Sequence, residues 1–297
     1  MPIEDFIITV FCLVVENFDR IFKEQNFRLR GFRPKLTDVE VITMEIVGEF
    51  LGLDTDKGIW CYFKTHWQPW FPALFSRSNF ARQASNLWRA KQMIQKEIAH
   101  KLNAENDSLH MADGFPLPVC KFKRAYLSRI FKGFAGYGYC ASKAETYYGF
   151  KGNLAINSVG VISNITFTSA NIDERESLWE IVENIKGLLF ADKGLIGTDF
   201  QQQLYVETGV NLQTPMRKNM IDPRGKDANL WLVSTRRLVE TVIGQLTERF
   251  NIEKNWARDL WHFTNRISRK VLSHTVAVFV NKMIGNQPLQ FDLLVAP

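Results

Sequence analysis

Three acidic residues stand where their carboxylates could hold metal ions. Asp113 ends a short apolar run, Asp192 ends a second one, and Glu240 lies inside a long stretch of helical character. Two carboxylates at strand ends and a third on a helix can meet at one point and bind divalent cations through hard oxygen ligands. Such a cluster predicts an enzyme that cuts and joins phosphodiester bonds.

The chemistry of such a cluster requires cations. Carboxylates within about 4 Å of one another repel by several kcal/mol at an effective dielectric near 20. Two Mg²⁺ ions roughly 3.5–4 Å apart neutralise that charge, activate an attacking oxygen and stabilise the leaving oxygen of a phosphoryl displacement. Oxygen ligands with open positions suit Mg²⁺ or Mn²⁺ rather than zinc.

Each of these acids also has a simpler interpretation. An aspartate at a strand end is often a turn former or helix cap, and Asp192 is followed at once by Lys193 and Gly194. Glu240 could pair with Arg236, four residues earlier, in a contact worth roughly 0.2–0.5 kcal/mol. Spacing alone leaves these interpretations open.

The elements that would position the acids differ along the chain. The first hundred residues have helical character, with a capping box at Thr37 and Glu40 and a further helix expected over residues 78–102. The polar run 103–108 is the expected domain boundary. Beyond it, residues 148–157 and 161–167 alternate in polarity and predict an antiparallel hairpin.

Strands and helices then alternate towards the end of the chain. We expect helices over residues 174–186, 199–207, 229–250 and 256–283, and strands at 188–191 and 210–214. This order favours an α/β fold in which a mixed sheet carries helices on its faces.

Composition is compatible with a nucleic-acid partner. The chain has 297 residues, with 37 lysines and arginines against 31 acids, a net charge of +6 and a pI near 9.1. The four cysteines form no CxxC pair, so we expect neither a zinc site nor a disulfide framework, and a cytoplasmic location. No apolar stretch approaches the roughly 20 residues that cross a bilayer, and the longest, residues 6–15, predicts a buried helix face.

Several sequence blocks occur together in a recognisable order. They are residues 111–120 (MADGFPLPVC), 138–143 (GYCASK), 148–151 (YGFK), 191–194 (ADKG), 214–219 (TPMRKN) and 236–242 (RRLVETV). On these blocks the chain resembles the DDE transposases of bacterial insertion sequences, most closely the nine-eighty-two family.

The resemblance implies a ribonuclease H-like catalytic domain over residues 106–297, preceded by an all-helical DNA-binding domain over 1–105. It implies that Asp113, Asp192 and Glu240 are the catalytic triad and bind two Mg²⁺ ions, for which Mn²⁺ substitutes, with Asp113 touching both. Water would free the 3′ end of the element, and that 3′-hydroxyl would attack target DNA. The expected partner is double-stranded DNA at the bacterial nucleoid, bound by a homodimer, with no membrane. We find no GxxxxGK[ST] loop and expect no nucleotide cofactor.

The chain departs from the family pattern in two respects. Related transposases often carry a tyrosine three residues before the arginine and a lysine seven after the glutamate, where this chain has Val233 and Thr247. The family's His-Asp pair after the third strand is replaced by Asp173 and Glu174. The roles of these family residues therefore do not transfer to this chain.

Basic residues at three kinds of place are expected to contact DNA. A stripe along the helix at 78–102 would position the element's ends, a basic segment interleaved with aromatics follows Asp113, and further cations belong to the recognised blocks. A solvated loop or helix face is the simpler alternative for the first two. The predicted DNA contacts are Arg82, Arg89, Lys96, Lys121, Lys123, Arg124, Lys151, Lys193, Arg217, Lys218, Arg236 and Arg237.

Two other functions fit the same residues. One is a ribonuclease H-like nuclease or resolvase that cuts without joining. The other is a DNA-binding remnant that represses transposition and needs no metal. Joined products from pre-cut ends would separate the first from a transposase, and metal-independent binding without nicking would identify the second.

Overall fold

The structure is a computed structural model that describes residues 1–23, 33–217, 219–220 and 222–295. The chain folds into two compact units. Unit 1 comprises Met1–Ile98, Leu246–Ile252 and Ala257–Pro297, and unit 2 comprises Ala99–Gln245 and Glu253–Trp256. Across the described ranges, no helix is long and apolar enough to cross a membrane.

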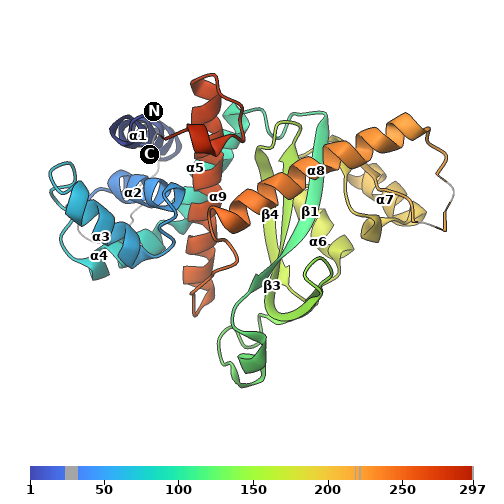
Figure 1. Ribbon diagram of the computed structural model, residues 1–297, viewed down its shortest axis with the longest axis horizontal. Coiled ribbons are helices and arrows are strands. Elements are labelled where there is room, and N and C mark those ends of the chain that lie inside the picture. Colours follow the sequence, from blue (N-terminus) through green and yellow to red (C-terminus); the bar gives the residue numbers. More distant parts are fainter. Residues whose placement is uncertain (24–32, 218, 221, 296–297) are drawn as a thin grey trace. The chain divides into compact units, whose positions relative to one another are not determined.

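Unit 1 is helical. Its elements are α1 (Ile3–Phe22), α2 (Asp38–Phe50), α3 (Asp56–His66), α4 (Arg77–Asn86), most of α5 (Trp88–Lys101), α9 (Leu260–Met283) and the 3₁₀ turn η3 (Phe291–Leu293). The predicted capping box starts α2: the Thr37 hydroxyl accepts the Glu40 N–H at 3.2 Å, and the Glu40 carboxylate accepts the Thr37 N–H at 2.6 Å. Every residue of α2 from Val41 to Phe50 is buried. The helix packs against α9 (Figure 1).

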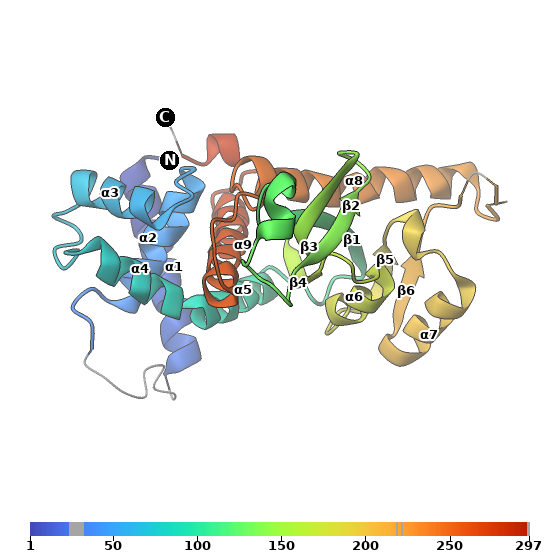
Figure 2. The same cartoon turned by 90° about the horizontal axis from the view of Figure 1, so that it is seen from below.

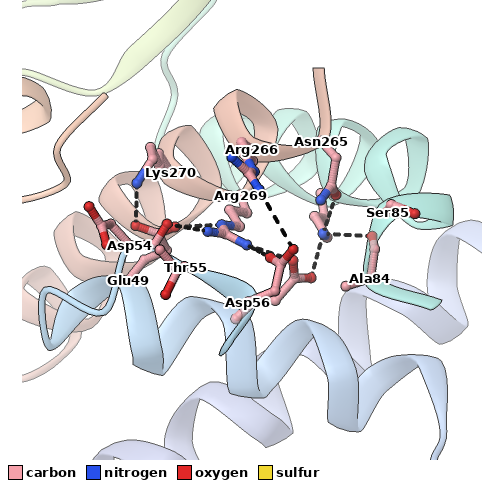
Figure 3. A network of polar contacts seen from close by, with 12 residues as sticks. Glu49, Asp54, Thr55, Asp56, Ala84, Ser85, Asn265, Arg266, Arg269 and Lys270 are labelled. Atoms are coloured by element: carbon pink, nitrogen blue, oxygen red, sulfur yellow. Dashed lines mark hydrogen bonds and ion pairs between the residues drawn. The ribbon is translucent and has the colours of Figure 1, made fainter. Parts of the chain in front are cut away.

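A network of buried charges holds α9 to α2 (Figure 3). Arg269 Nε donates to Glu49 Oε1 at 2.5 Å, and Lys270 Nζ donates to Glu49 Oε2 at 2.7 Å. Lys91 of α5 pairs with Glu45 of α2, and neither side chain is exposed to solvent. Removing one member of such a network would leave a buried charge unpaired, so these residues fix the helices of unit 1 together.

Unit 2 is built on a mixed six-stranded sheet. Its strands are β1 (Leu109–Pro118), β2 (Gly136–Cys140), β3 (Glu145–Asn157), β4 (Ile162–Ser169), β5 (Gly187–Phe190) and β6 (Val210–Gln213). The order is β2-β3-β1-β5-β6, and β4 also pairs with β3. Strands β1, β5 and β6 run parallel, while β2, β3 and β4 form antiparallel pairs. The predicted hairpin is the β3–β4 pair and is confirmed.

Helices cover both faces of this sheet (Figures 1 and 2). On one face, α6 (Glu174–Ile181) and α7 (Thr198–Thr208) form a core with the sheet that includes Leu178, Leu189 and Leu204. On the other face lies α8 (Lys226–Glu248), whose Trp231 ring packs edge-on against Phe190 with centroids 5.0 Å apart. The predicted α/β fold class, a ribonuclease H-like mixed sheet flanked by helices, is confirmed.

The expected helix over residues 78–102 is interrupted at Leu87, which separates α4 from α5. The Leu87 N–H donates to the Ala84 carbonyl at 3.1 Å in a tight turn, and the buried Lys91 Nζ donates to the same carbonyl at 3.0 Å. Lys91, a member of the buried charge network, thus binds a backbone carbonyl that would accept an N–H four residues later in a continuous helix.

The two compact units also differ from the expected division at residue 105. That division placed the last helix with the sheet, whereas α9 belongs to unit 1. The physical reason is the pairing of Arg269 and Lys270 with the carboxylate of Glu49. The assignment of DNA binding and catalysis to separate domains stays a prediction.

Candidate active site

Asp113 of β1 and Asp192, two residues beyond the end of β5, stand at matching positions relative to the register of these two parallel strands. Met111 of β1 is paired in register with Phe190 of β5. Asp113 lies two residues after Met111, and Asp192 lies two residues after Phe190. Paired strands lie about 4.8 Å apart, and residues two apart share a face. The register therefore brings the two carboxylates close together, at the point where β5 ends.

Arg236 of α8 bridges the two carboxylates. Its Nη2 lies 3.1 Å from Asp113 Oδ2, and its Nη1 lies 3.2 Å from Asp192 Oδ1. The fork geometry of a guanidinium suits two acceptors at once. One cation thus sits between the two predicted metal ligands and offsets their mutual repulsion.

Backbone N–H groups bind the remaining carboxylate oxygens. Asp113 Oδ1 accepts the Gly114 N–H at 2.8 Å, and Asp192 Oδ2 accepts the Gly194 N–H at 3.3 Å at the start of the 3₁₀ turn η2 (Lys193–Leu195). The simpler interpretation of Asp192 as a turn cap is therefore observed. Asp192 caps the turn and pairs with Arg236 at the same time, because Oδ2 accepts the Gly194 N–H while Oδ1 contacts the guanidinium.

The environment of Asp113 opposes its charge. Burial raises the pKa of its carboxyl, and the nearby Asp192 raises it further, while Arg236 and the Gly114 N–H act in the opposite direction. The net direction is upward from the ordinary value of 3.8. A carboxylate with a raised pKa and a charged partner in one cluster is typical of functional sites, although structural ion pairs also have this property.

Glu240 does not join the aspartates in this structure. It is exposed on α8, one helical turn after Arg236, or roughly 6 Å along the helix axis. Across residues 1–23, 33–217, 219–220 and 222–295, no three acidic, histidine or cysteine side chains are grouped so as to hold a metal ion. The alternative interpretation paired Glu240 with Arg236. In the structure the ion pairs of Arg236 are instead with Asp113 and Asp192.

Glu174 lies at the same place and was not predicted as a site residue. With Asp113, Asp192 and Asn153 it lines a hollow of about 20 Å³, enough for one water-sized particle. Lys151 Nζ, expected to contact DNA, donates to Glu174 Oε1 at 3.3 Å. The sequence signal was the substitution of the family's His-Asp pair by residues 173 and 174, but spacing alone could not place Glu174 beside the aspartates.

Most of the predicted DNA contacts are accessible. Lys151 and Arg236 are partly buried in the ion pairs described above, and Lys218 lies outside the described residues. The exposed ones are Arg82, Arg89, Lys96, Lys121, Lys123, Arg124, Lys193, Arg217 and Arg237. These side chains are open to solvent, as contact with phosphates requires.

The chain matches a known protein family over a range that includes all of unit 2. Residues 88–260, more than half of the chain, match the family model described as the transposase DDE domain. The matched range includes Asp113, Asp192 and Glu240. No curated protein and no solved structure matches the chain.

Proposed function

The chain belongs to the transposase DDE domain family, and from this premise we propose that it binds the ends of an insertion sequence and catalyses metal-dependent DNA strand cleavage and transfer. In this proposal Asp113, Asp192 and Glu240 are the metal-binding triad. The narrower assignment to the nine-eighty-two group and the pairing of two copies on DNA belong to the same proposal.

One observation carries the proposal: two carboxylates in matched strand register share a single cation. Asp113 and Asp192 both contact the Arg236 guanidinium at 3.1–3.2 Å. Their positions thus already provide a binding site for positive charge. Carboxylate oxygens are the ligands that Mg²⁺ and Mn²⁺ prefer, so the donor set fits these ions.

Arg236 would leave the aspartates when DNA binds. Guanidinium groups form bidentate pairs with phosphate as readily as with carboxylate. A scissile phosphate near Asp113 would draw Arg236 away and free the carboxylate oxygens for metal. When bound, divalent ions would activate the attacking oxygen and stabilise the leaving oxygen.

Glu240 would complete the site from α8. It lies one turn from Arg236, and residues four apart share a helix face. A modest shift of α8 or a change of side-chain rotamer on DNA binding would bring its carboxylate towards Asp113 and Asp192. Catalytic contacts are often longer in free enzymes than in their substrate complexes.

The exposed cations would supply the affinity for DNA. We assign the ends of the element to unit 1 through Arg82, Arg89 and Lys96, and the DNA around the acids to unit 2 through the remaining exposed cations. Each phosphate contact releases counterions, so binding would weaken steeply as salt rises. Replacing Arg237 by Gln should reduce the slope of log K against log salt by about 1.

The test is a cleavage and joining assay on the DNA that flanks the reading frame. Asp113→Asn, Asp192→Asn and Glu240→Gln should each lower the cleavage rate by roughly 10³-fold or more, as for other residues that act as a set. EDTA should abolish cleavage by the unaltered protein, and Mn²⁺ should restore it. Binding to the ends should persist in all three variants.

The same assay separates the competing functions. Pre-cut ends and a target plasmid should give joined products if the protein is a transposase. Cleavage without joining would favour a nuclease or resolvase, and EDTA-resistant binding with no nicking would favour a repressor. Full cleavage by any one of the three variants would reject the assigned triad.

A further inference from the structure

A second cavity in unit 2 lies apart from the hollow between the acids. It occupies about 380 Å³, within the roughly 300–1,000 Å³ of small-molecule sites. The end of β1, the turn between β2 and β3, and the segment at residues 253–256 form its walls. None of its lining residues belongs to the proposed triad.

Two of the lining side chains are exposed aromatics. Trp256 is 65% exposed and Phe122 is 49% exposed, values that leave ring faces open to a ligand. Phe122 packs edge-on against Tyr137 with ring centroids 6.2 Å apart, and Tyr137 in turn lies against Tyr148 at 5.1 Å. These contacts hold the Phe122 ring in place, which lowers the entropy lost when a flat ligand stacks on it.

Lysines give the edge of the cavity a positive character. Lys121, Lys143 and Lys254 line it together with the carboxylates of Glu145 and Glu253. Lys143 Nζ pairs with Glu253 Oε2 at 2.5 Å, which neutralises one of the two acids. Lys121 and Lys254 are exposed. An anionic group on a flat ligand would therefore find lysines at the cavity edge.

The cavity is near the acids along the same strand. Gly114, which lines the hollow between the acids, and Pro116, which lines the cavity, are two residues apart on β1 and so share a face of the sheet, about 7 Å apart. Tyr147 forms part of the wall, and its pKa is raised to about 12, first by burial and then by Cys140, Glu174 and Glu253. Glu174 also lines the hollow at Asp113. The two sites therefore lie within reach of one DNA strand.

We propose that this cavity captures one unpaired nucleobase of the bound DNA, stacked on Trp256 and Phe122, with Lys121 and Lys254 on the adjoining phosphates. The inference rests on the proposed function, because it takes DNA as the substrate. Stacking on aromatic side chains tolerates any base, since every base has a π-face. A base held here would fix the strand whose phosphate lies at Asp113, and extrusion costs least where pairing is already broken.

The test compares two DNA probes in EDTA, so that base capture is measured without cleavage. One is a duplex with a single bulged 2-aminopurine, and the other is the fully paired duplex with 2-aminopurine in the same sequence. The protein should bind the bulged probe roughly 5- to 150-fold more tightly, the range expected for one base stacked on an aromatic ring. Bulge binding should also quench 2-aminopurine emission.

Trp256→Ala should remove most of this preference and of the quenching while leaving affinity for paired duplex unchanged. Tyr205→Ala is the matched control, because Tyr205 is 58% exposed on α7 and lies outside the cavity. Phe122→Ala should weaken the preference less than Trp256→Ala, because Phe122 has the smaller ring and is less exposed. Circular dichroism and thermal unfolding of each variant check that the fold is kept.

Two results would overturn the assignment. Equal affinity of the unaltered protein for both probes would reject base capture, and an unchanged preference in Trp256→Ala would place the base elsewhere. Normal metal-dependent cleavage alongside either result would leave the proposed function standing. If the unaltered protein bound neither DNA probe, both proposals would be rejected together.

Discussion

Two arginine–carboxylate clusters of this protein differ mainly in their access to water. In unit 1, Arg269 and Glu49 are both essentially buried, with side chains 0% and 1% exposed. In unit 2, Arg236 is 16% exposed and its partners Asp113 and Asp192 are 23% and 40% exposed. The ion pairs are chemically alike, but only the second of these two clusters is open to water.

This difference assigns the clusters different tasks. A fully buried charge that loses its partner cannot be solvated by water, which makes the loss costly. The buried network therefore keeps the helices of unit 1 in fixed positions. A partly exposed pair gains less from its contact and loses less when it opens. The unit 2 cluster is therefore the one that we propose releases Arg236 and takes up a metal ion.

The largest expected effect is on the stability of unit 1. Arg269→Met removes the cation that Glu49 and Asp56 share and should lower the free energy of unfolding by about 3–5 kcal/mol, because Lys270 must then neutralise the buried Glu49 carboxylate without it. Urea denaturation measures this. Arg236→Met is the control and should cost about 1 kcal/mol or less, since its partners retain access to water. Equal losses would erase the distinction between the clusters.

The next effect is a coupling within the buried network. Glu45→Gln and Lys91→Met each break the same buried pair, in which burial raises the pKa of Glu45 and lowers that of Lys91. The double variant should lose less stability than the two single losses together, by roughly 1–3 kcal/mol. A double-mutant cycle in urea measures the coupling, and strictly additive losses would show that the pair does not act as a unit.

A smaller effect concerns pH and has opposite signs in the two clusters. The pKa of Asp113 is raised by burial, so its stabilising contribution is present below pH 3.8 and is lost as pH rises through its folded pKa. Burial also acts upward on Asp56, but pairing with Arg269 holds its pKa below 3.8. The contribution of Asp56 is therefore present above pH 3.8 and is lost as pH falls through its folded pKa.

These directions predict how two variants respond to pH. Asp113→Asn should be more stable than the unaltered protein at neutral pH, and this advantage should fade as pH falls towards 3.8. Asp56→Asn should be less stable at neutral pH, and its deficit should shrink below pH 3.8. Thermal unfolding across pH 3–8 compares them, and the same sign for both differences would contradict the account.

The smallest effect is expected at the surface of unit 1. Arg249 lies 3.2 Å from Asp292, whose side chain is 94% exposed. Asp292→Asn should change the unfolding free energy by no more than the roughly 10–15% uncertainty of the urea extrapolation. A loss comparable with that of Arg269→Met would mean that burial does not decide which ion pairs support this fold.

Local sequence patterns predicted much of the framework. The capping box at Thr37 and Glu40 located the start of α2, and alternating polarity located the β3–β4 hairpin. The short apolar runs before Asp113 and Asp192 located the start of β1 and most of β5, but β1 does not end at Asp113 as expected and continues to Pro118. These features depend on neighbours in sequence, which is why periodicity and capping rules detect them.

The errors arise where distant residues or glycines decide the structure. Helix α6 ends at Ile181 rather than near 186, and Asn184 beyond it has a positive φ. Strand β2 was not predicted because Gly136 and Gly138 offer no apolar face, while Tyr137 and Tyr139 are half exposed or more. Gly187 starts β5 with φ +90°, and a Cβ there would lie 2.6 Å from the Ser108 carbonyl oxygen.

The candidate site was predicted only in part for the same reason. Matched register between β1 and β5 places Asp113 beside Asp192, and that register is set by the whole sheet. The packing of α6 and α8 decides where the other side chains lie. It places Arg236 between the two aspartates and Glu174 beside them, and it leaves Glu240 away from them. No local pattern contains that information.

The central claim, that three distant carboxylates share metal ions on bound DNA, is tested most directly by Fe²⁺ substitution. Fe²⁺ with ascorbate and peroxide generates radicals that cut the polypeptide close to bound metal. The account predicts DNA-dependent cuts near residues 113, 192 and 240, suppressed by excess Mg²⁺ and absent in Asp113→Asn. Cuts confined to other segments, or an unchanged pattern in Asp113→Asn, would contradict it.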